Sequence, residues 1–422
     1  MLRKTTLGVI AGVLFMGVEG VGSLYLIRAL LHVQGSDQAS QFTLITYLWL
    51  AFNVVANSLG FVASRAAARL HDRNGLRLLV RNVSLVGKLV LVPATACVIL
   101  AMAALLAAGS TPAATAMASI LFIAGHSFRV LGLLKIYVSV GDGHLGSDKW
   151  YQLSMSLGFY AFAVVAAQHG TALMWLGAIY ACVGILVFAG SARWLGAILP
   201  SAPMSEEAGD VIAPRALALQ AMAMVGYTAA GFLAGNADAF IARTLLADTS
   251  FVQYAVTAKL GQVIALTAAL VPAMYGPRIT RAHLGADIDA LARYRRESLS
   301  VAVGLSTCGA LLMFALRDTI GRWLIPGGHE VFSSVLWIMA VGAILQAAAL
   351  SMANAINSVG GLGLVRLTLL SAAAAICTSI PLGRYFGPVG VATGTVCGSV
   401  VMIIGLRRIT SGVFLPRASS NP

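Results

Sequence analysis

Two charged residues, one acidic and one basic, lie deep in two long apolar segments in the second half of the sequence. Asp238 stands ten residues before Asp248, where a short turn joins the segments, and Lys259 stands eleven residues after it. If both segments are membrane helices that form a hairpin, each charge lies about 15 Å below the outer surface. A charge at this depth costs roughly 2.5–3.5 kcal/mol on insertion scales and must face a partner or a water-filled cavity. The spacing therefore indicates a transport protein.

Two roles are open for Asp238. Its carboxylate either binds a coupling proton or cation in a charged cavity, or forms a structural ion pair with Lys259 that neutralises both charges. Asn236 stands two residues away on a different face of the helix. It is a candidate for the same cavity or for a hydrogen bond between helices.

The first apolar segment also carries an acid. Glu19 lies among Gly17, Gly20 and Gly22, which would let another backbone or a ligand approach closely. An ionisable group at this depth indicates a function in binding or transport. The alternative is a structural contact with the next segment, where Asn53 and Asn57 reach a similar depth.

A third group of polar residues lies in the fourth segment. Arg129 and His126 are three residues apart and therefore share a helix face. A guanidinium in a cavity suits a phosphate or a sugar acid, because its fork matches two oxygens. The alternative is that Arg129 extends to the inner lipid headgroups, as we expect for Lys135.

The composition excludes a soluble protein. Of 422 residues, 59% are hydrophobic and only 10% charged, whereas about 25% of the residues in a soluble domain are charged. We therefore expect an all-α polytopic membrane protein. The net charge of +13 does not indicate nucleic acid, because the basic residues fall mainly in alternate loops, as the positive-inside bias predicts.

Metal and cofactor sites are not expected. The histidines have no paired spacing, and the five cysteines lie in apolar segments without metal-site spacing, so we interpret the cysteines as small buried hydrophobes. The sequence also lacks a phosphate-binding Gly-Lys-Ser/Thr loop, which leaves an ion gradient or the substrate gradient as the source of energy.

The hydropathy pattern predicts twelve transmembrane helices with both termini in the cytoplasm. In this topology all but a few of the 28 Lys and Arg residues fall on the inner side, the exceptions being Lys259, Arg28, Arg243, Arg317, Arg322 and Arg384. The predicted segments are 7–31, 40–64, 83–108, 113–140, 150–168, 172–195, 216–246, 250–273, 298–316, 331–353, 365–386 and 388–407.

The twelve segments divide into two six-helix bundles, 1–199 and 216–422. The cytoplasmic linker 200–215 between them is polar and contains three prolines. The first and seventh segments end alike, in Ile-Arg-Ala-Leu-Leu around Arg28 and Ala-Arg-Thr-Leu-Leu around Arg243. Both halves begin inside, so the sequence predicts parallel repeats with a cavity between the bundles.

Two basic stretches are predicted at the inner surface. Residues 65–81 carry five arginines interrupted by polar residues, which favours a solvated loop near anionic lipid. Residues 279–297 place apolar side chains against arginines, a pattern typical of a helix lying on the membrane surface.

Motifs in the second half resemble a known family. The stretch Asn236-Ala237-Asp238, followed by Tyr254, Pro272 and a basic loop up to Arg296, is similar to the oligosaccharide flippases of polysaccharide synthesis. The likeness continues in the small-residue turn Asn354–Gly363 and in the final hairpin, Pro381 to Thr393.

The resemblance implies an exporter of the multidrug, oligosaccharidyl-lipid and polysaccharide superfamily in the bacterial inner membrane. Such proteins alternate between inward-open and outward-open states and move a polyprenyl-pyrophosphate-linked oligosaccharide for O-antigen or exopolysaccharide synthesis. The implied partners are this substrate, membrane lipid, a coupling proton or sodium ion and polysaccharide-assembly proteins. The residues matched to the cavity are Asp238, Lys259 and Arg129, with Tyr254, Arg28 and Arg243 as further candidates.

Two alternatives remain open. One is a cation-coupled multidrug exporter of the same superfamily. The other is an enzyme, such as a membrane polysaccharide polymerase or acyltransferase, which requires a sizeable outer loop or clustered catalytic residues. Because the longest outer connection has about fourteen residues, we expect a protein that is not an enzyme.

Overall fold

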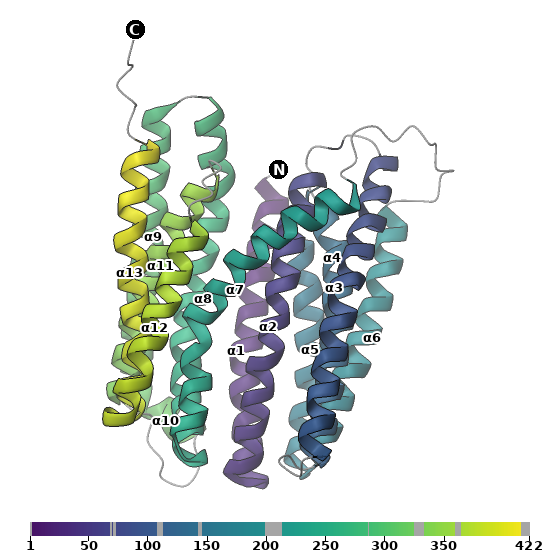
Figure 1. Ribbon diagram of the computed structural model, residues 1–422, viewed down its shortest axis with the longest axis vertical. Helices are drawn as coiled ribbons and strands as arrows, with labels where there is room; N and C mark the ends of the chain where they lie inside the picture. Colours follow the sequence, from purple (N-terminus) through teal and green to yellow (C-terminus); the bar gives the residue numbers. More distant parts are fainter. Residues whose placement is uncertain are drawn as a thin grey trace. The chain divides into compact units, whose positions relative to one another are not determined.

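A computed structural model of the protein describes residues 2–67, 70, 73–107, 113–141, 146–198, 213–285, 287–324, 333–358 and 364–414. These residues form thirteen α-helices and no strand (Figure 1). The chain divides into two compact units, Met1–Ala229 and Ala230–Pro422, with the boundary inside helix α7 (Pro214–Leu245). Most of the predicted linker, 200–215, lies outside the described residues.

The first unit consists of six long helices and the beginning of α7. Gly35 and Gly170 adopt positive φ values of 86° and 72° at the turns after the first and fifth helices, a conformation that favours glycine. The helices are α1 (Leu2–Val33), α2 (Gly35–Ala67), α3 (Arg73–Ala107), α4 (Ala113–Gly141), α5 (Ser147–Gln168) and α6 (Leu173–Ile198).

Helix α4 lies at the centre of the first unit, where it packs against α2, α3, α5 and α6. Its approach to α6 is close because glycines face each other: a Cβ on Gly125 would meet the Cα of Ala181 at 2.8 Å. Small residues of this kind let helix backbones pack tightly without a hydrophobic driving force. The central position of α4 explains why its polar side chains are buried.

The second unit consists of the rest of α7 and six further helices, of which α11 packs against α8, α9 and α13. Counted along the chain, α11 is the fourth long helix of the second unit, as α4 is the fourth of the first. The central helix therefore comes at the same place in the helix order of each unit. The helices are α8 (Asp248–Leu284), α9 (Ile288–Ala315), α10 (Arg317–Leu324), α11 (Ser333–Ser358), α12 (Leu364–Phe386) and α13 (Pro388–Phe414).

Each of the twelve predicted segments overlaps a helix of 22 residues or more. Three local predictions are wrong. Residues 317–324, predicted as part of an outer loop, form the short helix α10. Residues 279–297 are not a separate surface helix, because α8 continues to Leu284 and α9 begins at Ile288. Arg73, Arg77 and Arg81 likewise belong to α3 and not to a loop.

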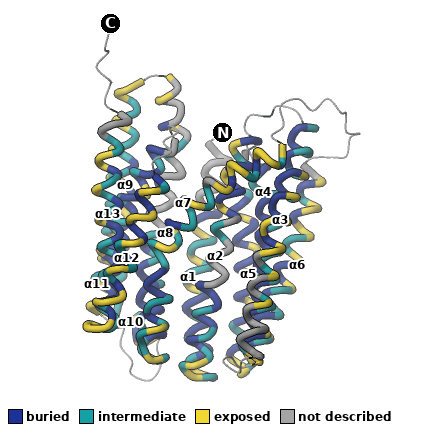
Figure 2. The backbone as a smooth tube through the Cα atoms, in the orientation of Figure 1, coloured by how far each residue is buried: buried dark blue, intermediate teal, exposed yellow. Residues whose placement is uncertain are grey.

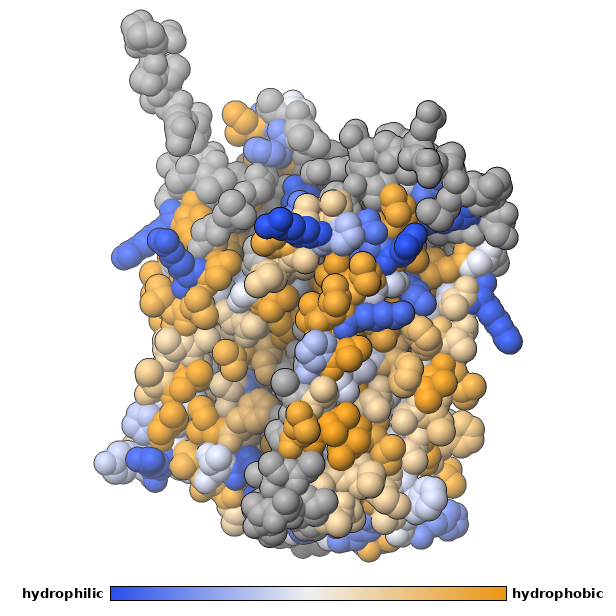
Figure 3. Space-filling model, turned by 45° about the vertical axis from the view of Figure 1, so that its right-hand side comes forward, coloured by the Kyte–Doolittle hydropathy of each residue, from blue (hydrophilic) through white to orange (hydrophobic). Residues whose placement is uncertain are grey.

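Nine of the described helices are long and apolar enough to cross a membrane, which confirms a polytopic membrane protein. Twelve crossings and cytoplasmic termini stay predictions. Buried residues lie where helices of one unit pack together (Figure 2), and hydrophobic side chains cover much of the surface between the helix ends (Figure 3).

The four cysteines whose side chains the structure describes do not lie in the core, contrary to the prediction, and the side chain of Cys97 lies outside the described residues. Cys182, Cys308 and Cys377 are exposed, and Cys397 is half-buried. Exposed apolar side chains share these helices, among them Leu186 on α6 and Leu311 on α9. The physical reason is that a membrane helix carries apolar residues on its lipid-facing side as well as in the core, so an apolar context does not predict burial.

Candidate functional site

Glu19 is held by helix α5. Ser156 donates a hydrogen bond to Oε2 of Glu19 at 2.5 Å, and the Tyr160 hydroxyl donates to Oε1 at 3.4 Å. Gly22, three residues further along α1, leaves the space that the ring of Tyr160 occupies, since a Cβ there would meet the ring at 2.6 Å. The two hydroxyls therefore present their protons to the oxygens of a half-buried carboxylate.

The alternative considered for Glu19, a contact with α2, does not match its hydrogen bonds, because its carboxylate accepts from Ser156 and Tyr160 of α5. Asn57 is exposed and accepts a hydrogen bond from Tyr137 at 3.4 Å, and Asn53 is half-buried. The mismatch has a physical cause. Equal depth in neighbouring segments does not fix the rotation of each helix about its axis, and α1 turns Glu19 toward α5.

Arg129 and His126 meet at the hydroxyl of Tyr180 on α6. Nη1 of Arg129 donates to this hydroxyl at 3.3 Å, and Nδ1 of His126 lies 3.1 Å from it. The imidazole and phenol rings are stacked, with an interplanar angle of 7°. Because the hydroxyl oxygen accepts from Arg129, its proton is available to Nδ1 of His126. The structure thus confirms that Arg129 and His126 share a face.

Arg129 is a buried cation and is only 4% exposed. Its backbone carbonyl accepts a hydrogen bond from the Tyr151 hydroxyl at 3.0 Å. Its Nε is buried without a hydrogen-bond partner in the part of the chain that the structure describes, and none of the ion pairs found there includes it. This burial rules out the interpretation that Arg129 extends to the inner headgroups, whereas Lys135 lies half-buried, 4.4 Å from the ring centroid of Phe188.

The Glu19 group and the Arg129 group belong to one polar cluster inside the first unit. Phe159 packs between them, with its ring centroid 5.0 Å from that of Tyr160 and 4.9 Å from that of Tyr180. The charges of Glu19 and Arg129 interact electrostatically without forming an ion pair. Four helices, α1, α4, α5 and α6, therefore surround the Glu19 carboxylate and the Arg129 guanidinium. The rings of Tyr160, Phe159 and Tyr180 lie between the two charged groups.

Asp238 is the buried acid of the second unit and is 7% exposed. The Tyr254 hydroxyl donates to Oδ2 at 2.7 Å, and the backbone N–H of Ala239 donates to Oδ1 at 2.9 Å. The side chain of Thr395 on α13 lines the same small cavity as Asp238. The structure thus brings together Asp238 and Tyr254, both predicted site residues.

A small cavity of about 20 Å³ adjoins this carboxylate. Polar side chains of four helices line it: Asp238, Gln262, Gln346 and Thr395. A cavity needs roughly 10–15 Å³ of this kind to hold a water molecule with two to four polar partners. The site therefore has room for one water molecule or a small cation beside the acid.

Asn236 and Lys259 take different positions around this site. Asn236 accepts a hydrogen bond from Nε2 of Gln262 on α8 at 3.2 Å, which confirms the proposed hydrogen bond between helices. Lys259 is half-buried on α8. In the described part of the chain, the hydrogen bonds to the Asp238 carboxylate come from Tyr254 and Ala239, and Lys259 is not among these donors.

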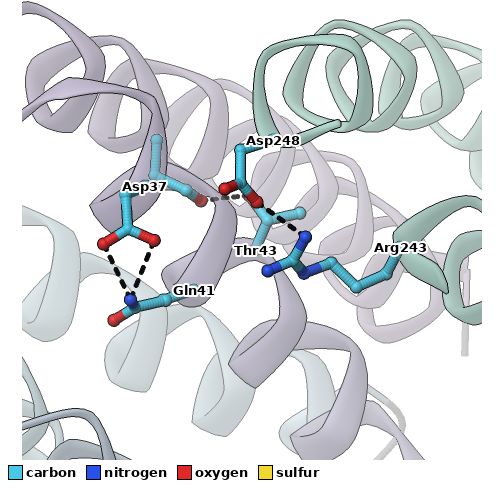
Figure 4. A network of polar contacts seen from close by, with 6 residues as sticks. Asp37, Gln41, Thr43, Arg243 and Asp248 are labelled. Atoms are coloured by element: carbon cyan, nitrogen blue, oxygen red, sulfur yellow. Dashed lines mark hydrogen bonds and ion pairs between the residues drawn. The ribbon is translucent and has the colours of Figure 1, made fainter. Parts of the chain in front are cut away.

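Arg28 and Arg243 lie near the ends of α1 and α7. Arg243 forms an ion pair with Asp248 at 2.6 Å, across the turn from α7 to α8 (Figure 4). Arg28 lies over the ring of Tyr25, with its Cζ 5.8 Å from the centroid. Figure 4 also shows Asp37 accepting hydrogen bonds from Gln41 on α2. Both arginines thus have local contacts at helix ends.

Comparison with known structures identifies the fold. A mutant of the Vibrio cholerae MATE transporter VcmN matches with a TM-score of 0.70 and 14% identity, covering 97% of this chain and 98% of that one. A multidrug resistance MATE family transporter of the MOP superfamily, in its outward-facing conformation, matches with a TM-score of 0.73 and 12% identity, over 96% and 94%. The lipid II flippase MurJ matches with a TM-score of 0.68 and 12% identity, over 97% and 88%.

This chain has the fold of MATE transporters and MurJ. No family model and no curated protein matches the sequence. At 12–14% identity the likeness is one of fold, which agrees with the fold that the sequence resemblance implied, and the matching structures are described as MATE transporters and a lipid II flippase.

Three hydroxyl side chains of the first unit, Ser156, Tyr160 and Tyr180, contact Glu19 or Arg129 but were not predicted from the sequence. Tyr160 and Tyr180 occur in strongly apolar helices, and a buried tyrosine usually needs a hydrogen-bond partner for its hydroxyl. The need for such a partner could have marked Tyr160 and Tyr180 as candidate site residues. Ser156 carried no comparable signal, because its contact with Glu19 spans 137 residues of sequence.

Proposed function

We propose that this chain is a cation-coupled exporter that moves a polyprenyl-pyrophosphate-linked oligosaccharide across the bacterial inner membrane by alternating access. One observation supports the coupling: each unit holds a carboxylate at a tyrosine hydroxyl, the half-buried Glu19 with Tyr160 and the buried Asp238 with Tyr254. A buried carboxylate in a membrane helix is costly and marks ion or proton pathways. The fold, which transporters share, supports the same function.

The coupling chemistry follows from the two acids. When a proton or a sodium ion occupies the site, the carboxylate no longer carries an uncompensated charge, which favours the conformation that encloses it. When the cation leaves, the charge favours a conformation that exposes the acid to water. A ligand shifts such an equilibrium only by its differential affinity for the two states, so removing either carboxylate should uncouple transport from the gradient.

The substrate assignment rests on the resemblance in the second half and on MurJ, which is described as a lipid II flippase. In this proposal the substrate passes between bundles 1–199 and 216–422, and the linker 200–215 joins the bundles on the cytoplasmic side. Membrane lipid and polysaccharide-assembly proteins are the expected partners, for O-antigen or exopolysaccharide synthesis. Lys259, Arg28 and Arg243 are proposed to line the substrate path.

A second candidate is a cation-coupled multidrug exporter. Its specific support is coverage: this chain spans 94–98% of the MATE transporters cited above but 88% of MurJ. The half-buried and buried acids suit cationic drugs as well as coupling ions. The two candidates therefore share a mechanism and differ in the molecule that is moved.

Reconstitution in liposomes distinguishes the candidates. We expect the purified protein to move a fluorescent polyprenyl-diphosphate oligosaccharide, placed in one leaflet, at least about tenfold faster than empty liposomes do. A cationic dye, ethidium, serves as the drug substrate in parallel. Movement of ethidium alone would select the second candidate, and movement of neither under any gradient would reject both.

The proposed topology has its own test. We expect single cysteines introduced at positions 205 and 420, in a variant whose native cysteines are replaced, to react with a membrane-impermeant maleimide only after the inner membrane is opened. Labelling of either cysteine in intact spheroplasts would contradict cytoplasmic termini or an inner linker.

A further inference from the structure

The described part of the second unit contains a cavity of about 280 Å³ where α9 meets α11. Arg295 and Arg296, in the first turns of α9, form one wall, and Ser351, near the end of α11, forms another. The rest of the lining is mostly apolar and includes Leu299 and Met352. This cavity is separate from the smaller one beside Asp238.

The two arginines lie where the sequence of α9 changes from polar to apolar. They are seven and eight residues beyond Ile288, about 11 Å along the helix axis, and an apolar sequence follows from Leu299. In the predicted topology this end of α9 faces the cytoplasm. Arginines at such a boundary lie at the level of the lipid headgroups, where the cytoplasmic leaflet carries negative charge.

Arg296 brings a positive charge to the cavity, and no ion pair within the described residues neutralises this charge. None of the ion pairs formed within the described ranges includes this residue, whose side chain is exposed. Ser351 shares a hydrogen bond with Ser298 of α9, with 2.8 Å between the two oxygens. That contact holds α9 and α11 together directly beside the arginines and leaves further acceptor and donor capacity on the hydroxyls.

We propose that this cavity binds the phosphate group of an anionic membrane phospholipid. Arg295 and Arg296 supply charge-assisted hydrogen bonds to the phosphate oxygens, which the planar guanidinium matches in pairs. The apolar wall around Leu299 and Met352 accommodates the first carbons of the acyl chains. Because the site spans two helices, the bound lipid joins α9 to the central helix α11.

Nanodiscs of two compositions test the proposal. The protein is placed in phosphatidylcholine alone or in an equimolar mixture of phosphatidylcholine and phosphatidylglycerol, and its thermal unfolding is followed. We expect phosphatidylglycerol to raise Tm by at least about 3 °C, since a ligand that binds only the native state stabilises it. The double variant Arg295→Gln/Arg296→Gln should lose most of this rise while keeping its Tm in phosphatidylcholine.

The matched control is Arg293→Gln, which removes the same charge from the same helix at a residue that does not line the cavity. It should retain the rise. If the double variant does not fold, the single variant Arg296→Gln is used, and native mass spectrometry counts phosphatidylglycerol molecules retained by the wild type and this variant.

An equal rise, or equal retention, in wild type and cavity variants would overturn the proposal. So would a rise in Tm of the same size when inorganic phosphate or diphosphate is added to phosphatidylcholine nanodiscs, because the site would then recognise a soluble anion. None of these readouts depends on the transported substrate, so a failure here leaves the proposed exporter function untouched.

Discussion

Tyr180 accepts a hydrogen bond from Arg129 and lies within hydrogen-bond distance of His126, so one phenolic oxygen connects a buried guanidinium and a buried imidazole. This oxygen is 3.3 Å from Nη1 of Arg129. In an apolar bundle the cost of an unsatisfied buried charge is high, and Tyr180 is the only side chain of the described residues for which a hydrogen bond to the guanidinium is found.

We therefore expect Tyr180→Phe to destabilise the first unit. The change keeps the aromatic contacts with Phe159 but removes the acceptor of Arg129, which should cost about 1–3 kcal/mol. Thermal unfolding in detergent measures the loss. The control is Tyr25→Phe, whose hydroxyl has a long 3.4 Å contact with the exposed side chain of Gln168; a loss of equal size in the control would contradict the assigned role.

Glu19→Gln should uncouple transport with little effect on folding. The amide oxygen can still accept the hydrogen bond from Ser156, and the amide NH2 in place of the other oxygen can donate to the Tyr160 hydroxyl, whereas the side chain no longer binds a proton or a cation. We expect gradient-driven transport to fall at least about tenfold. Purified amounts and Tm should stay near those of the wild type, and retention of gradient-driven transport by the variant would remove Glu19 from the coupling site.

The relation between Asp238 and Lys259 is tested by a double-mutant cycle. We expect Asp238→Ala and Lys259→Ala each to impair export, because the hydrogen bonds to Asp238 among the described residues come from Tyr254 and Ala239 and Lys259 is proposed to line the substrate path. The double variant should be at least as impaired as either single one. Recovery of normal export in the double variant would instead identify a structural ion pair.

Packing of α4 on α6 gives a prediction that is independent of transport. A Cβ on Gly184 would meet the carbonyl oxygen of Gly125 at 2.5 Å, whereas a Cβ on Gly190 of the same helix would meet nothing within 4 Å. We expect Gly184→Ala to lower the free energy of unfolding by about 1–3 kcal/mol. Gly190→Ala should leave it unchanged or raise it, and a loss of stability in both variants would show that the close approach is not the cause.

The sequence predicted the helices well and the site only in part. The length of an apolar segment determines whether it can become a membrane helix, and each long helix coincides with a predicted apolar segment. The short helix Arg317–Leu324, which carries alternating charges, was not predicted. Depth along a helix could be predicted for Glu19, Arg129 and Asp238, since it depends only on residue count.

The partners of these residues could not be predicted in the same way. Which face of α1 meets α5 depends on packing around Gly22 and Tyr160, and which hydroxyl reaches Arg129 depends on α6, some fifty residues further along the chain. The one exception is Asn236, for which spacing alone suggested a hydrogen bond to a neighbouring helix.

The central claim, cation-coupled movement of a lipid-linked oligosaccharide, is tested most directly in liposomes that contain the purified wild-type protein. The transfer of fluorescent polyprenyl-diphosphate oligosaccharide between leaflets is measured with a proton gradient, with a sodium gradient and with neither. We predict that one of the two gradients speeds transfer at least about tenfold and that this gain disappears in the Glu19→Gln variant. Transfer at the rate of empty liposomes, or at one rate under all three conditions, would contradict the proposal.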